Sequence, residues 1–416
     1  MKSFYRIVSS FIILVAFNTA NAESIKWLHL FGEDSSQYPN MVRAVEEFEA
    51  KTGHTVVMQY LENESFKAKL PTMLQSNDRP DIFYSWGGGV MYDQARAGFL
   101  RDVSSVVPDS YLNTVSAAAA DAFTFEGQRV GLPLQVSQVA WWYNKDLMSQ
   151  AGVDVSQIKM WDDLLGAVKQ IKAAGITPIC MGGKDKWPVH FVWTHLHIRN
   201  GGKGLFLESL NNGGWDRPEY IRSGEQMLEL VELEPFQKGW LAATWPDQAG
   251  FFGDGKCAMA FMGNWMYGAQ ASNSASGEGL ADANMGMFNM PMTSGGIGDS
   301  GDTLGGINGW LFSSTASDAA VELMMHYVSL DIQKEDASNG AYIPIVKGAD
   351  GSLTNPFLQQ VAKNISNSEY HQIFYDQFLG ADIGRVVNDV STDLAAGIIS
   401  AEEATQAVQE AWEFNQ

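Results

Sequence analysis

The sequence is poor in basic residues and in cysteine. Its 416 residues include 27 lysines and arginines against 48 aspartates and glutamates, and the formal net charge is −21 at pH 7. This acidic balance argues against nucleic acid or an anionic membrane surface as a partner. The two cysteines, Cys180 and Cys257, form no CxxC pair, so neither a redox motif nor a zinc knuckle is indicated. They are compatible with a disulfide in an oxidising compartment and equally with two buried free thiols.

Familiar catalytic motifs are also absent from the sequence. It contains no GxSxG, no HExxH and no cysteine next to a histidine. His190, His195 and His197 are candidates for a metal cluster, but residues two apart do not share a helix face. We therefore expect no metal site and no cofactor. A carboxylate pair of the glycosidase type is not excluded, because acidic residues are abundant.

Long apolar runs are missing except at the N-terminus. There, Lys2 and Arg6 precede the apolar residues 7–17, and the small residues 20–22 (Ala-Asn-Ala) follow as an A-x-A cleavage site. This order predicts a secretory signal peptide that is cut before Glu23. A membrane anchor is the weaker interpretation, because a spanning helix needs about 18 or more continuous apolar residues. We expect the mature protein in the periplasm.

The rest of the chain alternates between strand-like and helix-like patterns. In its first part the predicted strands are 24–31, 54–61 and 81–85, and the predicted helices are 38–53 and 90–100. A second series begins near Val139 and includes an amphipathic helix at 161–175 and strands at 176–182 and 256–265. Such alternation indicates βαβ units with a parallel sheet, and the chain is long enough for two hydrophobic cores. The predicted class is α/β.

Tryptophan is abundant at the ends of the predicted strands. Trp86 follows the strand 81–85 and precedes three consecutive glycines, 87–89. These glycines lack the spacing of a phosphate-binding loop, which leaves a structural turn or a close approach of a ligand to the backbone. Other tryptophans in similar positions are Trp187, Trp265 and Trp310.

Polar side chains accompany these tryptophans. They are Glu33, Asp34, Gln135, His190, Asn264 and Asn308. An aromatic face can stack on the C–H face of a sugar ring, while carboxylates and amides can bind its hydroxyl groups. The combination favours a carbohydrate over a lipid or an ion as ligand.

At six places the sequence resembles the extracellular solute-binding proteins of ABC sugar importers, the family that includes maltose-binding protein. The segments are NDRPDIFYSW (77–86), AGFLRDVS (97–104), GQRVGLPLQVSQVAWWYNKDLMSQAGVD (127–154), WDDLLGAVKQIKAAGITPI (161–179), FFGDGKCAMAFMGNW (251–265) and GGINGWLFSSTASDAA (305–320). The resemblance covers nearly the whole mature chain, and YNKDLMSQAG and GKCAM…GNW are its most specific motifs. No catalytic motif belongs to this family.

The resemblance implies a two-lobed periplasmic-binding-protein fold of the α/β class, with a hinge between the lobes. We expect the signal peptide at 1–22, the first lobe at 23–134 and 292–340, and the second lobe at 135–291 and 341–416. The composition shifts at Gln135–Ala140 and at Met287–Pro291, so we expect these segments to cross between the lobes.

The resemblance also implies a set of ligand-binding residues. In the first lobe, the site would be lined by Trp86, Glu33 and Asp34. In the second lobe, it would be lined by Trp187, Asn264 and Trp265. Further ligand-binding groups of the first lobe would be Gly306, Asn308 and Trp310, and Gln135 and His190 are additional polar groups near strand ends. The glycines after Trp86 would clear space for the sugar and offer backbone N–H groups to it.

The predicted function is that of a periplasmic protein that binds a mono- or oligosaccharide between its lobes. It would deliver the sugar to the permease subunits of an ABC importer, and we expect a monomer without enzymatic activity. Two alternatives stay open: a secreted carbohydrate-active enzyme such as a glycosidase, and a binding protein for a non-sugar solute such as a polyamine or a metal ion.

Overall fold

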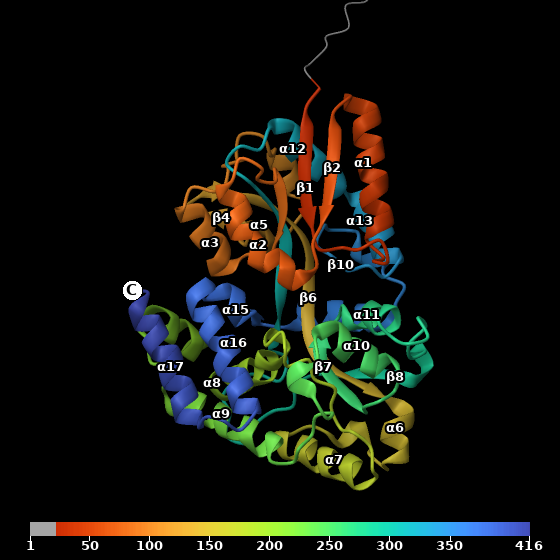
Figure 1. Cartoon of the computed structure of the whole chain (residues 1–416), viewed down its shortest axis with the longest axis vertical. Coiled ribbons are helices and arrows are strands. Elements are labelled where there is room, and N and C mark those ends of the chain that lie inside the picture. Colours follow the sequence, from red (N-terminus) through yellow and green to blue (C-terminus); the bar gives the residue numbers. More distant parts are fainter. Residues whose placement is uncertain (1–21) are drawn as a thin grey trace, which may run out of the picture.

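The structure, a computed structural model, describes residues 22–416 of the chain. The predicted signal peptide lies outside these residues except for Ala22. The described chain forms two α/β lobes, one above the other in Figure 1, and each lobe has its own hydrophobic core. Within 22–416, no helix combines the length and the apolar character that a bilayer crossing would require.

The first lobe contains the N-terminal elements and two helices that return to it late in the sequence. Its elements are β1 (Ser24–His29), α1 (Tyr38–Thr52), β2 (Thr55–Tyr60), α2 (Asn63–Gln75), β3 (Ile82–Ser85), α3 (Gly88–Arg96), α4 (Asp109–Leu112), α5 (Ala117–Asp121), β4 (Thr124–Phe125), β5 (Gln128–Arg129), α12 (Asp318–Tyr327) and α13 (Leu330–Ser338). Strand β1 pairs in parallel with both β2 and β3, as the alternating pattern predicts.

The second lobe is mainly helical around a few short strands. Its elements are α6 (Lys145–Gln150), α7 (Trp161–Ala173), α8 (Trp187–Asn212), α9 (Pro218–Val231), α10 (Trp245–Gly253), β7 (Met259–Gly263), α11 (Met266–Ser272), β8 (Met285–Phe288), α14 (Pro356–Asn367), β11 (His371–Ile373), α15 (Tyr375–Phe378), α16 (Ala381–Ala395) and α17 (Ala401–Phe414). In Figure 1, α15, α16 and α17 lie on one side of this lobe, and α6 lies on the other.

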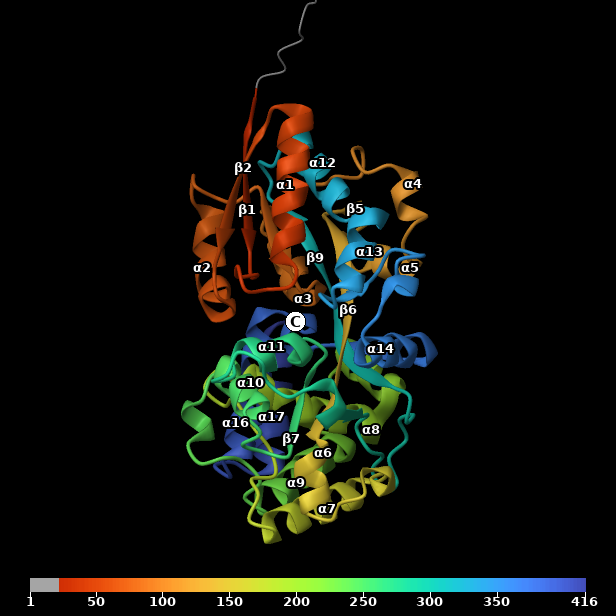
Figure 2. The same cartoon turned by 90° about the vertical axis from the view of Figure 1, so that its right-hand side faces the viewer.

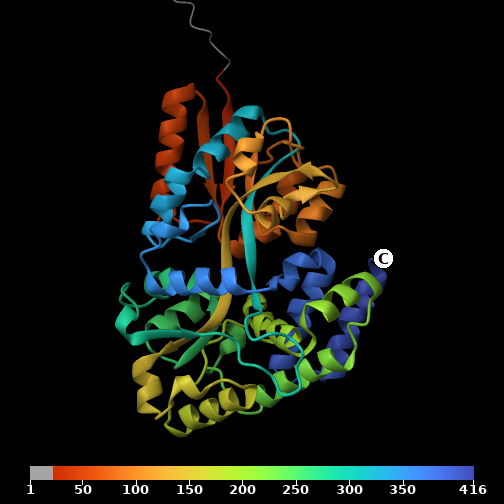
Figure 3. The same ribbon diagram turned by 180° about the vertical axis from the view of Figure 1, so that it is seen from behind.

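Two long strands, β6 (Gly131–Asn144) and β9 (Thr303–Phe312), belong to both lobes. The first half of β6 pairs antiparallel with β9, and its second half pairs with β7 and β8. One end of β9 pairs with β3 in the first lobe, and the other end pairs with β11 in the second. Figures 2 and 3 show both strands running from one lobe into the other. A third passage between the lobes carries the short strand β10 (Ile343–Pro344), which pairs with β6.

Local sequence explains the helices that the patterns predict. In α7, a stripe of apolar residues with helical spacing is buried in the second core: Trp161, Leu164, Leu165, Val168 and Ile171. In α1, Met41, Val45 and Phe48 are buried. Gly53 ends that helix with φ of 77°, a left-handed conformation in which glycine has no Cβ penalty. Both predicted helices are confirmed.

The predicted strand at 176–182 does not form. Ile179 makes only isolated bridges to Phe236 and Met259, and the rest of the segment is irregular. Pro178 offers no backbone N–H to a sheet ladder, which limits the pairing to this short stretch. As a consequence, Trp187 does not follow a strand but is the first residue of α8.

The segment Met287–Pro291 does not cross between the lobes. Residues 285–288 form β8 beside β6, and the buried Arg199 holds the chain that follows against the second lobe. The guanidinium of Arg199 donates hydrogen bonds to the main-chain carbonyls of Met290, Ser300 and Asp302 at 3.0 to 3.3 Å. The chain therefore returns to the first lobe later, along β9.

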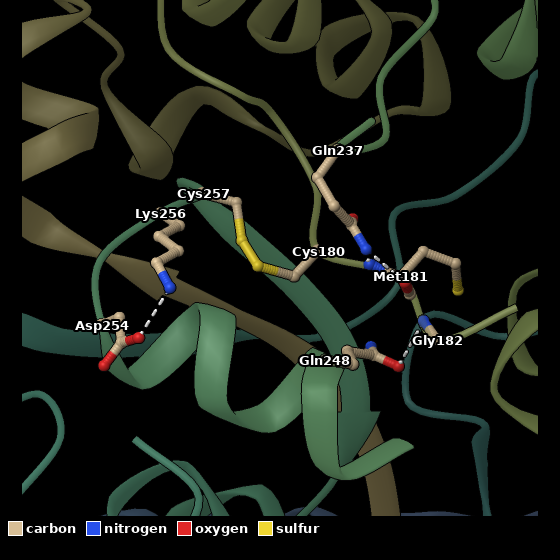
Figure 4. The surroundings of a disulfide bond; sticks show 8 residues. All are labelled: Cys180, Met181, Gly182, Gln237, Gln248, Asp254, Lys256 and Cys257. Atoms are coloured by element: carbon tan, nitrogen blue, oxygen red, sulfur yellow. Dashed lines mark hydrogen bonds and ion pairs between the residues drawn. A yellow bond between two sulfur atoms is a disulfide. The ribbon is translucent and has the colours of Figure 1, made fainter. Parts of the chain in front are cut away.

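The two cysteines form a disulfide between the irregular segment and the start of β7 (Figure 4). The Cα atoms of Cys180 and Cys257 lie 5.6 Å apart, inside the usual range for a disulfide. Next to the bond, Gln237 accepts a hydrogen bond from the amide of Met181 at 2.9 Å and donates one to its carbonyl at 2.6 Å. The crosslink and this paired contact fix a segment that no sheet ladder holds.

Replacing both Cys180 and Cys257 by alanine should lower the free energy of unfolding by about 2–5 kcal/mol, because a crosslink that closes a long loop restricts the unfolded chain. The two residues are 77 positions apart. Urea unfolding of both proteins measures the change. A reductant should shift the midpoint of the parent protein and leave the double variant unaffected. Equal midpoints for the oxidised parent and the variant would contradict a stabilising disulfide.

Candidate functional site

A cleft lies between the two lobes where β6 and β9 cross. A cavity of about 240 Å³ in it is lined by Leu30, Phe31, Asn63, Lys67, Tyr84, Trp86, Gln135, Trp187, Phe191, Trp245, Trp265, Asn308, Phe374, Asp376 and Gln377. An adjoining cavity of about 640 Å³ shares six of these residues: Lys67, Tyr84, Trp86, Trp187, Asp376 and Gln377. The two cavities thus form one elongated cleft with walls from both lobes.

The floor of the cleft is polar and is built by the crossing strands. A β-bulge between Pro133 and Gln135 shifts the register of β6, and Gln135 then lies opposite Asn308 of β9. Bulges re-aim side chains, and here the two amides line the cavity. Gln135 donates a hydrogen bond from Nε2 to the hydroxyl oxygen of Tyr84 at 2.9 Å. Burial raises the pKa of Tyr84 above its ordinary value, so its hydroxyl stays protonated and able to donate.

Aromatic side chains form the two facing walls. On the first lobe, Trp86 lies edge-on to Tyr84 and Phe66, with ring centroids 5.3 and 5.9 Å apart. On the second lobe, Trp187 packs against Trp245 at 5.7 Å and Trp265 at 6.4 Å. Neighbouring rings hold the indoles in place and leave flat apolar surface toward the cleft.

Lys67 of α2 lies between these walls. Its Nζ atom is 5.3 Å from the ring centroid of Trp86 and 5.5 Å from that of Trp187, both within cation–π range. Glu64, one turn earlier, lies 3.4 Å from the same ammonium group. The lysine therefore connects the first lobe to a tryptophan of the second.

The acidic group of the cavity is Asp376 in α15. Its Oδ2 atom accepts hydrogen bonds from Gln377 at 3.2 Å and from Asn388 at 3.4 Å. Behind it, the fully buried His190 has its Nε2 atom 3.8 Å from Oδ1 of Asp376. Burial lowers the pKa of His190 and outweighs the opposite effect of the carboxylate, so this ring is neutral near pH 7.

Five residues expected from the sequence come together in this cavity. They are Trp86, Gln135, Trp187, Trp265 and Asn308. They arrive from the end of β3, from the two crossing strands and from the starts of α8 and α11, although up to 222 positions separate them in the sequence. Their contact with a ligand stays a prediction.

The other six expected residues do not line the cavity. Glu33 and Asp34 border a separate hollow of about 530 Å³ near Tyr38 and Tyr60. His190 lies behind Asp376, and Trp310 is fully buried against Trp27 and Tyr84 in the first core. The carboxamide oxygen of Asn264 accepts the amide of Gln138 at 3.0 Å, and the amide of Gly306 donates to the hydroxyl of Ser137 at 3.1 Å. These four groups are thus engaged in the fold.

The glycines after Trp86 also have a role other than the one expected. Gly87, Gly88 and Gly89 do not line the cavity. Instead, a Cβ atom at Gly88 or Gly89 would collide with the main chain of Gln377–Gly380 in the second lobe. A group does approach the backbone of these glycines closely, as expected, but it is the main chain of the second lobe and not a ligand.

Sequence reasoning missed several residues of the site. Trp245 carried a usable signal, because Trp187-Pro188 and Trp245-Pro246 both open a helix with the same Trp-Pro pair. Lys67 and Asp376 carried none, since both lie within ordinary helical patterns. Only the packing of α2 and α15 at the cleft brings them to the site.

Comparison with known proteins identifies the type of fold. Residues 32–335 match the model of the bacterial extracellular solute-binding protein family. An uncharacterized ABC transporter extracellular-binding protein of Pyrococcus horikoshii is 24% identical over 49% of this chain and 46% of its own. The multiple sugar-binding protein of Streptococcus mutans is 23% identical over 47% of each chain. The matched region spans about half the length of these curated relatives.

Solved structures match over a longer range. A chitin oligosaccharide binding protein superposes with a TM-score of 0.85 at 23% identity, over 94% of this chain and 98% of its own. A structure from work on xylan utilization by Caldanaerobius polysaccharolyticus gives a TM-score of 0.86 at 23% identity, over 93% and 99%. These similarities confirm the predicted two-lobed α/β fold.

Trp86 and Trp310 were both predicted from the sequence to bind the ligand, but their replacement by alanine should change the stability of the fold by different amounts. Trp310→Ala should lower the free energy of unfolding by about 3–5 kcal/mol, because the ring is fully buried in the first core. Trp86→Ala should cost clearly less, because part of its ring already faces the cleft. Urea unfolding of both variants without added sugar measures the difference. Losses of equal size would show that Trp86 is a core residue.

Proposed function

Because the chain belongs to the family of bacterial extracellular solute-binding proteins, we propose that it is the substrate-binding component of an ABC importer for a mono- or oligosaccharide. The observation that carries this proposal is the cleft itself. It places indole rings of both lobes opposite one another above a floor of amides.

The chemistry of the cleft suits a sugar. Trp86 and Trp187 offer flat apolar faces to the C–H faces of a pyranose ring. Gln135, Asn308 and Gln377 supply amide donors and acceptors for hydroxyl groups, and Asp376 adds a carboxylate acceptor. Asn308 is especially suited, because its buried Oδ1 atom has no hydrogen-bond partner in the described structure.

The length of the cleft favours an oligosaccharide over a single sugar unit. The smaller cavity continues into one of about 640 Å³ along Trp86 and Trp187. The names of the matched relatives point the same way: one is a multiple sugar-binding protein and another a chitin oligosaccharide binding protein.

Closure of the lobes would enclose the sugar. We propose that residues 25–134 and 310–332 belong to one lobe and residues 139–304 and 343–416 to the other, because buried residues of these ranges contribute to the first and the second core, respectively. Bending at the passages between them, along β6, β9 and β10, would open and close the cleft, since hinges need only a few residues to change. The closed form would dock on permease subunits.

The protein would work in the periplasm as a monomer. The proposed location is supported by the basic residues and apolar run of the N-terminal segment and by the extracellular family. Protein recovered from the periplasm should begin at Glu23, and retention of the leader would contradict export by this signal.

An enzymatic role is less well supported. Among the described residues, Asp376 is the one carboxylate that lines the smaller cavity, and Glu64, Asp185 and Asp389 line the adjoining one. A glycosidase needs a pair of carboxyl groups about 5–9.5 Å apart on either side of the bond it cleaves. The carboxylates of the adjoining cavity are paired within the protein: Glu64 with Lys67, Asp389 with Lys186, and Asp185 with the amide of Trp245. Since the matched family also consists of solute-binding proteins, we propose binding without turnover.

A thermal-shift screen against chito-, xylo- and malto-oligosaccharides and their monosaccharides tests the function. At about 100 times the dissociation constant, a bound sugar should raise the free energy of unfolding by roughly 2.7 kcal/mol. Incubation with the same sugars should yield no new products. A protein that no sugar stabilises, or one that cleaves them, would overturn the proposal.

Trp86→Ala should weaken binding of the sugar found in this screen. Truncation of a stacked aromatic at a binding hot spot costs about 2 kcal/mol or more, which corresponds to roughly 30-fold in affinity. Trp412→Ala is a matched control, because this half-buried tryptophan lies on α17 outside the cleft. Calorimetric titration of both variants measures the effect. Equal affinities would remove Trp86 from the site.

A further inference from the structure

The N-terminus of α3 touches the second lobe at one rim of the cleft. Figure 1 shows α3 directly above α15 and α16. An added Cβ atom at Gly88 would lie 2.9 Å from the carbonyl oxygen of Gln377 and from the Cα atom of Phe378. At Gly89 it would lie 2.4 Å from the amide nitrogen of Gly380 and 2.6 Å from the carbonyl oxygen of Phe378.

These clashes depend on the position of the other lobe. Gly88 has φ of 69°, which by itself favours glycine. Gly89 has no such conformation, so its own backbone accepts any residue. The atoms it would strike are main-chain atoms of the second lobe, and no side-chain rotation can relieve that collision. A side chain at position 89 is therefore excluded only while the lobes are together.

A hydrogen bond joins the lobes one turn further along α3. The Oδ2 atom of Asp93 accepts the amide of Ala381 at 3.3 Å. Ala381 is the first residue of α16, whose own N-cap residue, Gly380, has no side chain to satisfy the free amides. A carboxylate at a helix N-terminus is stabilising, so the first lobe provides the cap that the second lobe lacks.

This contact also bears on the ligand cleft. Asp376 and Gln377, which line the cavity, lie in the four-residue helix α15, which ends two residues before Gly380. The separation between α3 and α15 thus sets the distance from Trp86 to these two polar groups.

We propose that Gly88, Gly89 and Asp93 of α3, together with residues 377–381, form a latch that holds the lobes at the cleft width needed for tight sugar binding. The inference rests on the proposed function. Gly89 and Asp93 act as positioning residues: they touch no ligand but fix the second-lobe groups that do. Because opening the lobes must break these contacts, the latch slows sugar release more than it affects sugar capture.

Gly89→Ala tests the latch through binding kinetics. With the oligosaccharide that the screen identifies, the dissociation rate should rise by about tenfold or more. The association rate should change much less, because most affinity differences among variants of one interface lie in the dissociation rate. The unfolding free energy of the sugar-free variant should not fall. Gly204→Ala is the matched control, because this glycine of α8 has φ outside the left-handed region and no atom within 4 Å of its added Cβ. Unchanged release from Gly89→Ala would overturn the latch.

A second pair of variants keeps the test independent of any folding defect at position 89. Asp93→Ala removes the cap and should speed release on the order of tenfold. Asp93→Asn should restore slow release, because asparagine caps a helix as well as aspartate does. Asp93 also pairs with Arg96 at 3.1 Å, and asparagine lacks the charge for that pair. If Asp93→Asn released sugar as fast as Asp93→Ala, at the parent's rate or faster, the hydrogen-bonded cap would not slow release, and its part in the latch would be refuted.

The experiment separates failure of the latch from failure of the proposed function. If the parent protein binds a sugar and Gly89→Ala behaves like it, only the latch fails. If no sugar binds the parent protein, the proposed function fails, and hydrogen exchange of the amides of residues 377–384 then decides on the latch. Faster exchange in Gly89→Ala than in the parent supports the contact, and equal exchange overturns it.

Discussion

The antiparallel pairing of β6 with β9 is the interaction on which the position of the cleft depends. Both strands carry backbone hydrogen bonds in both lobes. At Gly305 an added Cβ atom would lie 1.7 Å from the carbonyl oxygen of Ser137, so only glycine permits this approach. Further along the same pair, the bulge between Pro133 and Gln135 places Gln135 opposite Asn308, and both side chains line the cavity. One pair of strands therefore connects the lobes and also supplies the floor of the site.

The two lobes contribute unequal parts to the site. The first lobe offers Trp86, held edge-on by Tyr84 and Phe66, and the cation of Lys67. The second offers Trp187 in a cluster of rings and the carboxylate of Asp376. Neither half can enclose a ligand alone. Contacts between the lobes, such as Lys67 over Trp187 and the latch on α3, decide how these halves face each other.

Local patterns predicted the elements better than they predicted the site. The helix predicted at 161–175 forms because both its apolar stripe and its end are determined by residues within this short segment. Asn308 and Trp310 show the limit: they share a strand face, but one lies where the lobes meet and the other deep in the first core. The alternation of residue types predicts which face of a strand a side chain lies on. It does not predict whether that part of the strand lies at the cleft or inside the core.

Long-range packing accounts for most of what the sequence did not reveal. Asp376 reaches the cleft only because α15 packs beside α3, almost 290 positions earlier in the chain. The three consecutive glycines, 87–89, predicted a close approach to the backbone, but the sequence did not show which group approaches. A ligand and a protein backbone impose the same demand on a glycine, and only the fold distinguishes them.

The central claim is that the two lobes close around a sugar by bending at the crossing strands. Small-angle X-ray scattering of the mature protein with and without a saturating sugar tests it most directly. The account predicts a larger radius of gyration for the sugar-free protein, and for the complex a scattering curve that fits this structure with α3 against α15. An identical radius of gyration in both states, at a sugar concentration that saturates binding, would contradict it.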